Sequence, residues 1–171
     1  SFALGNTLKN GVNVAIIGEP NVGKSTLLNA LIGDDRAMVS DIAGTTRDTI
    51  EATTIIGGIK YRFVDTAGLR TTDDKLEQMG IERTHRAIEK AHIVLHIVSA
   101  ENPIFEDVTL RNDQHYIRII NKIDTITISD TLSGNPALLI SAKQDIGIAE
   151  LRDMLCKTTD TSQLGSGSVV V

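Results

Sequence analysis

The hydrophobic positions of the chain fall into short clusters that predict strands alternating with helices. The segment from Val12 to Ile17 is rich in β-branched residues and is followed by Gly18, which is typical of a buried strand. After Gly18, residues 24–31 are helix-forming and place apolar side chains about one helical turn apart. The predicted strands are 12–17, 49–56, 59–64, 93–98, 116–120 and 138–140, and the predicted helices are 24–31, 76–91 and 148–155.

This order of elements predicts a three-layer α/β domain with a mostly parallel six-stranded sheet. Gly57-Gly58, between two predicted strands, indicates a two-residue hairpin, which supplies one antiparallel strand. Residues 99–115 must cross between two parallel strands, and their length is near the minimum of about a dozen residues for such a connection. Their helical pattern is weak, so we expect a distorted connection or one that lacks residues.

Composition narrows the classes of function. A chain of 171 residues with 41% hydrophobic residues suits one domain with its own core. The net charge of −5 argues against sequence-independent nucleic-acid binding by this domain, but it allows a local site for an anion. The single cysteine, Cys156, the absence of an apolar run of roughly 20 residues and the lack of a signal-peptide pattern favour a cytoplasmic protein without a membrane partner.

The segment Gly18-Glu19-Pro20-Asn21-Val22-Gly23-Lys24-Ser25 matches the phosphate-loop pattern G-x-x-x-x-G-K-S. Its place between a predicted strand and a predicted helix favours a phosphate site over a structural turn. Lys24 would neutralise the β- and γ-phosphates, and the Ser25 hydroxyl would bind Mg²⁺. The predicted phosphate-binding residues are Asn21, Val22, Gly23, Lys24, Ser25 and Thr26.

Asp65-Thr66-Ala67-Gly68 follows a strand roughly 40 residues after the phosphate loop, a spacing that favours a nucleotide sensor over an ordinary turn. Asp65 would hold Mg²⁺ through a water, and the Gly68 N–H would reach the γ-phosphate. Leu69 stands where many GTP-hydrolysing proteins carry a water-orienting glutamine. The residues alone therefore leave open which group would position the attacking water.

Two later motifs predict recognition of a guanine base. In Asn121-Lys122-Ile123-Asp124, the Asp124 carboxylate can accept both the N1–H and the N2–H₂ of guanine, the Lys122 stem can cover the base, and Asn121 can tie neighbouring loops together. The backbone of Ser141, Ala142 and Lys143 can contact the guanine O6. Either motif alone would more often be a solvated loop. Four motifs in this order, each after a predicted strand, indicate a guanine-nucleotide domain.

Residues 40–48, SDIAGTTRD, form the candidate first switch. A threonine in such a loop can bind Mg²⁺ when the γ-phosphate is present and release it afterwards. Thr45 and Thr46 both qualify, and a flexible polar loop is the alternative.

Together these motifs resemble the translation-factor-related bacterial GTPases that carry a hydrophobic residue in place of the catalytic glutamine. Within them the match is closest to the G domain of the MnmE (TrmE) family of tRNA modification GTPases. The stretches that carry it are SFALGNTLKNG, GEPNVGKSTLLNAL, VSDIAGTTRD, DTAGLR and LEQMGIERTHRAIEKA. It covers most of residues 1–98 and then NKID and LISAK, and it is weak in 99–115 and 125–136.

The resemblance implies a P-loop GTPase (Ras-like) fold and a division of the chain. Residues 12–160 would be the G domain. Residues 1–11 would be a linker from a preceding helical domain, and residues 161–171, which are Gly/Ser-rich at 162–168, a linker that returns to it. The folate-binding domain and the C-terminal cysteine motif of the family would lie outside this chain.

The resemblance also implies catalytic and metal-binding residues. Glu77 would orient the attacking water through a bridging water, whereas an isolated glutamate would be read as a solvated helix charge. Potassium would stabilise charge that develops on the phosphates. The implied potassium ligands are Asn21, Ser40, Ile42 and Thr45, and Ser40 and Thr45 would also contact the nucleotide. The implied magnesium ligands are Ser25, Thr46 and, through a water, Asp65.

The function implied is potassium-stimulated GTP hydrolysis to GDP that drives dimerisation of two G domains during modification of the wobble uridine, position 34, of tRNA. The partners implied are a second copy of the chain, the flavoprotein MnmG, and tRNA and folate bound by other domains. A ribosome-assembly GTPase of the Der or Era type, which the phosphate loop and DIAGTTRD also resemble, is the first alternative. A regulatory module that binds GTP with negligible hydrolysis is the second.

Overall fold

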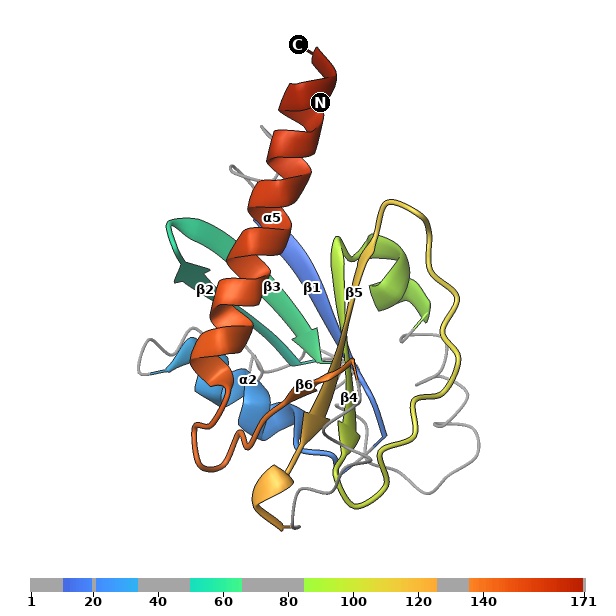
Figure 1. Cartoon of the computed structure of the whole chain (residues 1–171), viewed down its shortest axis with the longest axis vertical. Helices are drawn as coiled ribbons and strands as arrows, with labels where there is room; N and C mark the ends of the chain where they lie inside the picture. Colours follow the sequence, from blue (N-terminus) through green and yellow to red (C-terminus); the bar gives the residue numbers. More distant parts are fainter. Residues whose placement is uncertain (1–10, 20, 34–49, 66–84, 126–135, 171) are drawn as a thin grey trace, which may run out of the picture.

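A computed structural model describes residues 11–19, 21–33, 50–65, 85–125 and 136–170 of the chain, and every structural statement below concerns these residues (Figure 1). The strands are β1 (Val12–Ile17), β2 (Ile50–Ile56), β3 (Ile59–Asp65), β4 (Ile93–Ser99), β5 (His115–Asn121) and β6 (Leu138–Leu139). The helices are α2 (Lys24–Ile32), α5 (Ile148–Val170) and the short 3-10 helix η1 (Ile123–Thr125), and residues 85–90 are also helical.

The six strands form one sheet in the order β2-β3-β1-β4-β5-β6. β1 lies between β3 and β4 and is parallel to both, and β5 is parallel to β4 and β6. β2 is antiparallel to β3 through the turn at Gly57 and Gly58, whose φ values of 58° and 81° suit glycine. The predicted mostly parallel six-stranded sheet with one antiparallel hairpin strand is confirmed.

Side chains on the two faces of the sheet enter separate hydrophobic clusters. On one face, α2 and α5 pack residues such as Leu28 and Leu155 against β1, β3 and β4, and this is the main core (Figure 1). On the other face, Ala15, Val94 and Ile88 meet in a smaller cluster, with Ile88 supplied by helical residues 85–90. Alternate residues of a strand point to opposite faces, so the mostly apolar runs of β1 and β4 serve both clusters.

The last helix is longer than its apolar pattern predicts. The sequence predicts a helix over 148–155, but α5 continues to Val170 and includes the Gly/Ser-rich residues 162–168 that were expected to be a linker. Adding residues to an existing helix costs far less than starting one. No proline follows residue 148 to end this helix, so a polar, glycine-containing segment extends it.

The connection between β4 and β5, residues 100–114, contains no helix, although the structure describes every residue of it. Phe105, Val108 and Leu110 pack from this irregular segment, half-buried, on the second face of the sheet. The expectation of a distorted connection is confirmed. These three packed apolar residues are consistent with the weak helical pattern of this segment in the sequence.

Two histidines near this face make hydrogen bonds that hold neighbouring elements together. The Asn13 N–H donates to His92 Nδ1 at 2.9 Å, and His96 Nδ1 lies 2.6 Å from the Tyr116 hydroxyl. Burial lowers the pKa of both imidazoles, and the nearby Arg118 lowers that of His96 further. In the described part of the chain, no helix is long and apolar enough to cross a membrane.

The packing of α5 on the sheet predicts that Leu155→Ala strongly lowers the stability of the fold. Leu155 is fully buried, so the lost burial and the cavity should lower the free energy of unfolding by about 2–5 kcal/mol. Lys157→Ala, at an exposed position two residues along the same helix, should change it by less than about 0.5 kcal/mol. Urea unfolding checks the pair, and equal midpoints for the two variants would show that α5 does not hold the core together.

Candidate nucleotide-binding site

The predicted motifs meet at one edge of the sheet, where the parallel strands end. The phosphate loop follows β1, Asp65 is the last residue of β3, and Asn121 is the last residue of β5. The strand register sets Asp65 beside Ile16 and Asn121 beside Ser99, so these ends lie at similar heights. In Figure 1 this edge is at the bottom, around the lower end of β4 and η1. Ligands of open α/β sheets bind outside this edge.

Two glycines of the phosphate loop occupy positions that no side chain could share. A Cβ on Gly18 would lie 2.4 Å from the carbonyl oxygen of Ile97, and a Cβ on Gly23 would lie 2.4 Å from Asn121 Nδ2. Gly23 also has a φ of 96°, which glycine adopts readily. The loop therefore lies against β4 on one side and against the Asn121 loop on the other.

The start of α2 is suited to an anion. Its N-cap is Gly23, no side chain caps the helix there, and its first turn carries no acidic residue. The first backbone N–H groups of a helix have no partner within the helix, and together with the helix dipole they attract a phosphate. Lys24 is buried, and its Nζ donates to the carbonyl oxygen of Gly18 across the loop. Ser25 is half-buried and Thr26 is exposed.

Asn121 joins three loops through one buried side chain. Its Nδ2 donates to the carbonyl oxygen of Val22 at 2.8 Å, and its Oδ1 accepts the N–H of Ala142 at 3.0 Å. The residue is only 2% exposed. The phosphate loop and the loop after β6 are thereby fixed to the end of β5, which is the tie that the sequence predicts for Asn121.

The Lys122 side chain runs back toward the phosphate loop. Its Nζ donates to the carbonyl oxygen of Asn21, so its aliphatic stem lies along one side of the gap between the two loops. Lys122 and Asn21 have φ values of 67° and 73°, an uncommon region for residues with side chains. Strained backbone of this kind is held by surrounding contacts and is concentrated at binding sites.

A buried serine orients the carboxylate predicted to bind the base. Ser141 is fully buried, and its Oγ donates to Asp124 Oδ1 at 2.7 Å while it accepts the Gln144 N–H at 3.3 Å. Asp124 is exposed, so its carboxylate is oriented and still accessible to a ligand. Lys143 is also exposed. The structure thus brings predicted base-recognition residues from two separate loops together.

One supporting residue was missed by the sequence reasoning. The Thr125 hydroxyl donates to the Lys122 carbonyl oxygen at 2.7 Å and closes the turn that presents Asp124. A threonine hydroxyl that donates to the carbonyl oxygen of the residue three positions earlier is a known local pattern, and the threonine was visible in the sequence.

Several predicted residues lie outside the described part of the chain. These are the potassium and first-switch residues Ser40, Ile42, Thr45 and Thr46, the sensor residue Gly68, and Glu77. Of Asp65, only the backbone position at the end of β3 is described. The roles assigned to all these residues stay predictions.

A parallel sheet with a phosphate loop after its first strand and a base-recognition loop after β5 defines the P-loop GTPases. The family model described as 50S ribosome-binding GTPase matches residues 13–134, and the chain belongs to this family. The predicted GTPase activity and the predicted binding of GTP and GDP agree with this membership.

The relatives point to one branch of the family. The chain is 43% identical to the tRNA modification GTPase MnmE of Flavobacterium johnsoniae over 189 residues, which cover 100% of this chain and 41% of that protein. It is 42% identical to MnmE of Bacteroides fragilis, again over 100% of this chain and 41% of the relative. The sequence-based recognition of an MnmE-type G domain is confirmed. The chain spans about two fifths of the length of these relatives.

Solved structures of other GTPases share the fold. Era of Aquifex aeolicus, bound to GDP·AlF4⁻, is 29% identical with a TM-score of 0.63, over 85% of this chain and 56% of that one. The G domain of the Thermotoga maritima FeoB iron transporter is 21% identical with a TM-score of 0.59, over 85% of this chain and 97% of that one, and it supports the fold alone. The predicted P-loop GTPase (Ras-like) fold is confirmed.

The buried hydrogen bonds of Asn121 predict that Asn121→Ala weakens both folding and nucleotide binding. The change leaves the Val22 carbonyl and the Ala142 N–H without partners, so the free energy of unfolding should fall by about 1–3 kcal/mol without nucleotide. GDP affinity, measured by calorimetry, should fall at least about tenfold because two loops lose their tie. Asn112→Ala, at an exposed asparagine, is the control. Wild-type stability in Asn121→Ala would contradict the bridging role.

Proposed function

We propose that the chain is the GTP-hydrolysing domain of a tRNA modification protein of the MnmE type. The observation that carries the proposal is the match to MnmE relatives, at 43% identity, over the whole chain. The predicted domain limits are consistent with it, since the relatives extend well beyond the aligned span. A cytoplasmic location is part of the proposal.

The residues at the phosphate loop suit a nucleotide phosphate with a hard metal ion. Lys24 and the start of α2 supply positive charge, and the Ser25 hydroxyl stands on the first turn of α2. Asp65, at the end of β3 beside β1, would add a carboxylate through water. Hydroxyl, carboxylate and phosphate oxygens are the donors that Mg²⁺ prefers, and the ion would neutralise charge between the phosphates. Era, a relative, is known in complex with MgGDPNP.

A potassium ion beside the phosphates is the second metal in the proposal. Asn21, in the phosphate loop, is its ligand within the described part of the chain, and the positive φ of this residue turns the loop sharply there. Ser40, Ile42 and Thr45 would complete the site, and Thr46 would serve Mg²⁺. An added positive charge at this place would stabilise the transition state of phosphoryl transfer.

Glu77 is the proposed water-positioning residue. Leu69 has no polar atom with which to orient a water, so the task falls to another side chain. Hydrolysis would be coupled to dimerisation with a second copy of the G domain, because the potassium site and the first switch share residues. MnmG, tRNA and folate would be engaged by the full-length protein.

A ribosome-assembly function is the second candidate. The family model is described by ribosome binding, and Era, at 26% identity, is known in complex with nucleotides 1506–1542 of 16S ribosomal RNA. The net charge of −5 weighs against direct RNA binding by this domain. Co-purification of the full-length protein with MnmG supports the first candidate, and co-purification with a ribosomal subunit supports the second.

The oriented carboxylate of Asp124 predicts a change of base specificity in Asp124→Asn. The amide presents a donor where guanine needs a second acceptor, so GTP affinity should fall by about 10²–10³-fold. Xanthosine triphosphate, which carries a carbonyl at position 2, should bind the variant more tightly than the wild type. Competition binding measures both constants. Unchanged GTP preference would remove Asp124 from the base site.

Glu77 and potassium are tested together by GTP turnover of the chain. Turnover should be several-fold faster in potassium than in sodium, and Glu77→Ala should lower it by about 100-fold while GTP binding is retained. Glu89→Ala, at an exposed glutamate, is the control. Full turnover in Glu77→Ala would refute its catalytic role, and negligible turnover in the wild type with both cations would favour a regulatory module.

A further inference from the structure

The helix-free connection between β4 and β5 leaves one face of the sheet thinly covered. Parallel strands are joined by crossovers that normally lay a helix on the sheet, and both faces of such a sheet are usually covered. Here residues 100–114 supply an irregular segment instead. The alignment with the Flavobacterium johnsoniae relative spans 189 residues, so that protein has about 18 residues within the span that this 171-residue chain lacks.

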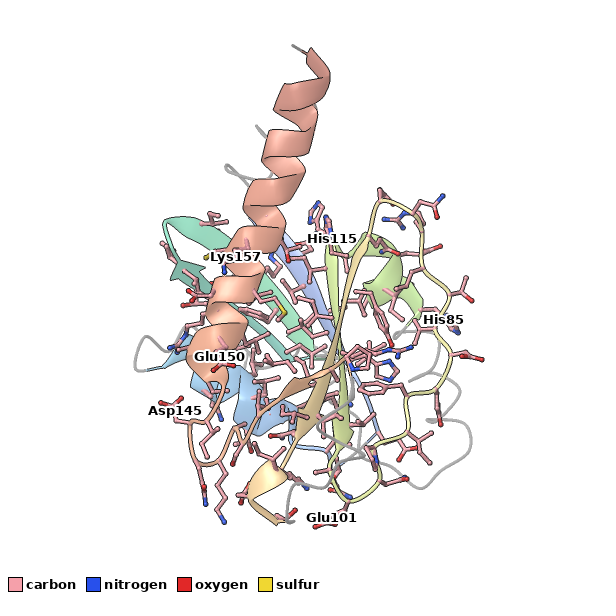
Figure 2. All side chains as sticks on the ribbon, viewed as in Figure 1. His85, Glu101, His115, Asp145, Glu150 and Lys157 are labelled. Atoms are coloured by element: carbon pink, nitrogen blue, oxygen red, sulfur yellow. The ribbon has the colours of Figure 1, made fainter. Side chains whose placement is uncertain are left out.

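A cavity of about 690 Å³ lies where a crossover helix would pack. It lies between the phosphate loop, the helical residues 85–90 and residues 102–109. Figure 2 shows His85 on this side of the sheet, close to the connection, while Glu150 and Lys157 lie on α5. The apolar lining of the cavity comes from Ile17, Val22, Ile88, Val98, Ile104 and Val108.

The described lining of this cavity is acidic. Glu19, Glu106 and Asp107 border it, all three are exposed, and no lysine or arginine is among the described lining residues. Two histidines, His85 and His96, also border it. Burial together with Arg118 lowers the pKa of the His96 imidazole, so His96 adds no positive charge near neutral pH. Ile104, at the same opening, is 69% exposed, which is unusual for a large apolar side chain beside a cavity.

We propose that this cavity docks a basic amphipathic helix of a partner protein, which takes the place of the missing crossover helix. The apolar lining would receive the leucine-like face of such a helix, and the acidic border would pair with its lysines or arginines. An acidic helix would place negative charge beside Glu106 and Asp107. A neutral helix would leave these two carboxylates without a partner of opposite charge. Charge complementarity therefore selects a basic partner.

Docking in this cavity would affect the nucleotide site, because the two share residues of the phosphate loop. Gly18 and Val22 line the cavity and also belong to the phosphate loop, and Val22 is fixed to Asn121 by the hydrogen bond at 2.8 Å. Residues 85–90, which form another wall, directly follow the segment after Asp65. The partner would therefore contact the phosphate loop directly, and this holds whether or not the chain acts in tRNA modification.

The test measures binding of a fluorescein-labelled synthetic helix of about 18 residues, with leucines on one face and lysines on the rest, to the whole chain loaded with GDP. Fluorescence anisotropy should give a micromolar Kd. Ile104→Asp, and separately the double variant Glu106→Lys/Asp107→Lys, should weaken binding at least about tenfold. Both changes are at exposed positions, so the variants should fold, which circular dichroism checks.

Matched controls separate this docking from general stickiness. Ile55→Asp changes an isoleucine that is 70% exposed on β2, and Glu150→Lys/Asp153→Lys changes two exposed acids on α5, so neither should affect binding. A peptide with glutamate in place of lysine should not bind. Replacing residues 100–114 by the aligned connection of the Flavobacterium johnsoniae relative should abolish peptide binding and preserve GDP binding. No binding to the wild type, equal loss in Ile55→Asp and Ile104→Asp, or full binding to the grafted chain would each overturn the proposal.

Discussion

The site depends on one buried amide, that of Asn121. Its two hydrogen bonds, to Val22 and from Ala142, join a loop near residue 20, a loop near 120 and a loop near 142. Each of these loops follows a different strand, and loops at the edge of a sheet have few other contacts to hold them together. Because the amide is buried, neither bond competes with water, and both add to the order of the site. Phosphate and base recognition are therefore set at a fixed separation before any nucleotide binds.

The same constraint explains why glycine is needed at position 23. The Asn121 amide occupies the space that a Cβ would take, so the close approach of the two loops is possible only without a side chain there. The Lys122 side chain reinforces this approach from the other side through the Asn21 carbonyl. The base half of the site is thus held by contacts within the described chain. The proposed γ-phosphate sensor consists of Asp65 and residues that follow it, and its role stays a prediction.

The sequence predicted the sheet and the base half of the site because their signals are local. Apolar runs mark β1 and β4, and each motif directly follows a strand, so its position at the sheet edge follows from the topology. The extension of α5 to Val170 could not be predicted, since glycine and serine disfavour a helix and only its packed first turns explain it. Nor could the Ser141–Asp124 hydrogen bond, because two loops 17 residues apart meet only in three dimensions. Glu77 came from resemblance alone, since its spacing does not distinguish it from its neighbours.

The phosphate loop has two sides, and the structure gives them different neighbours. One side carries the start of α2, where Gly23 leaves the helix uncapped for an anion. The other side, through Gly18 and Val22, borders the cavity left by the helix-free connection. A side chain at position 18 would clash with the Ile97 carbonyl, so only glycine lets the loop lie this close to β4. A ligand in the cavity would act on the loop through Val22, and the helix-free connection leaves open a surface that a crossover helix normally covers.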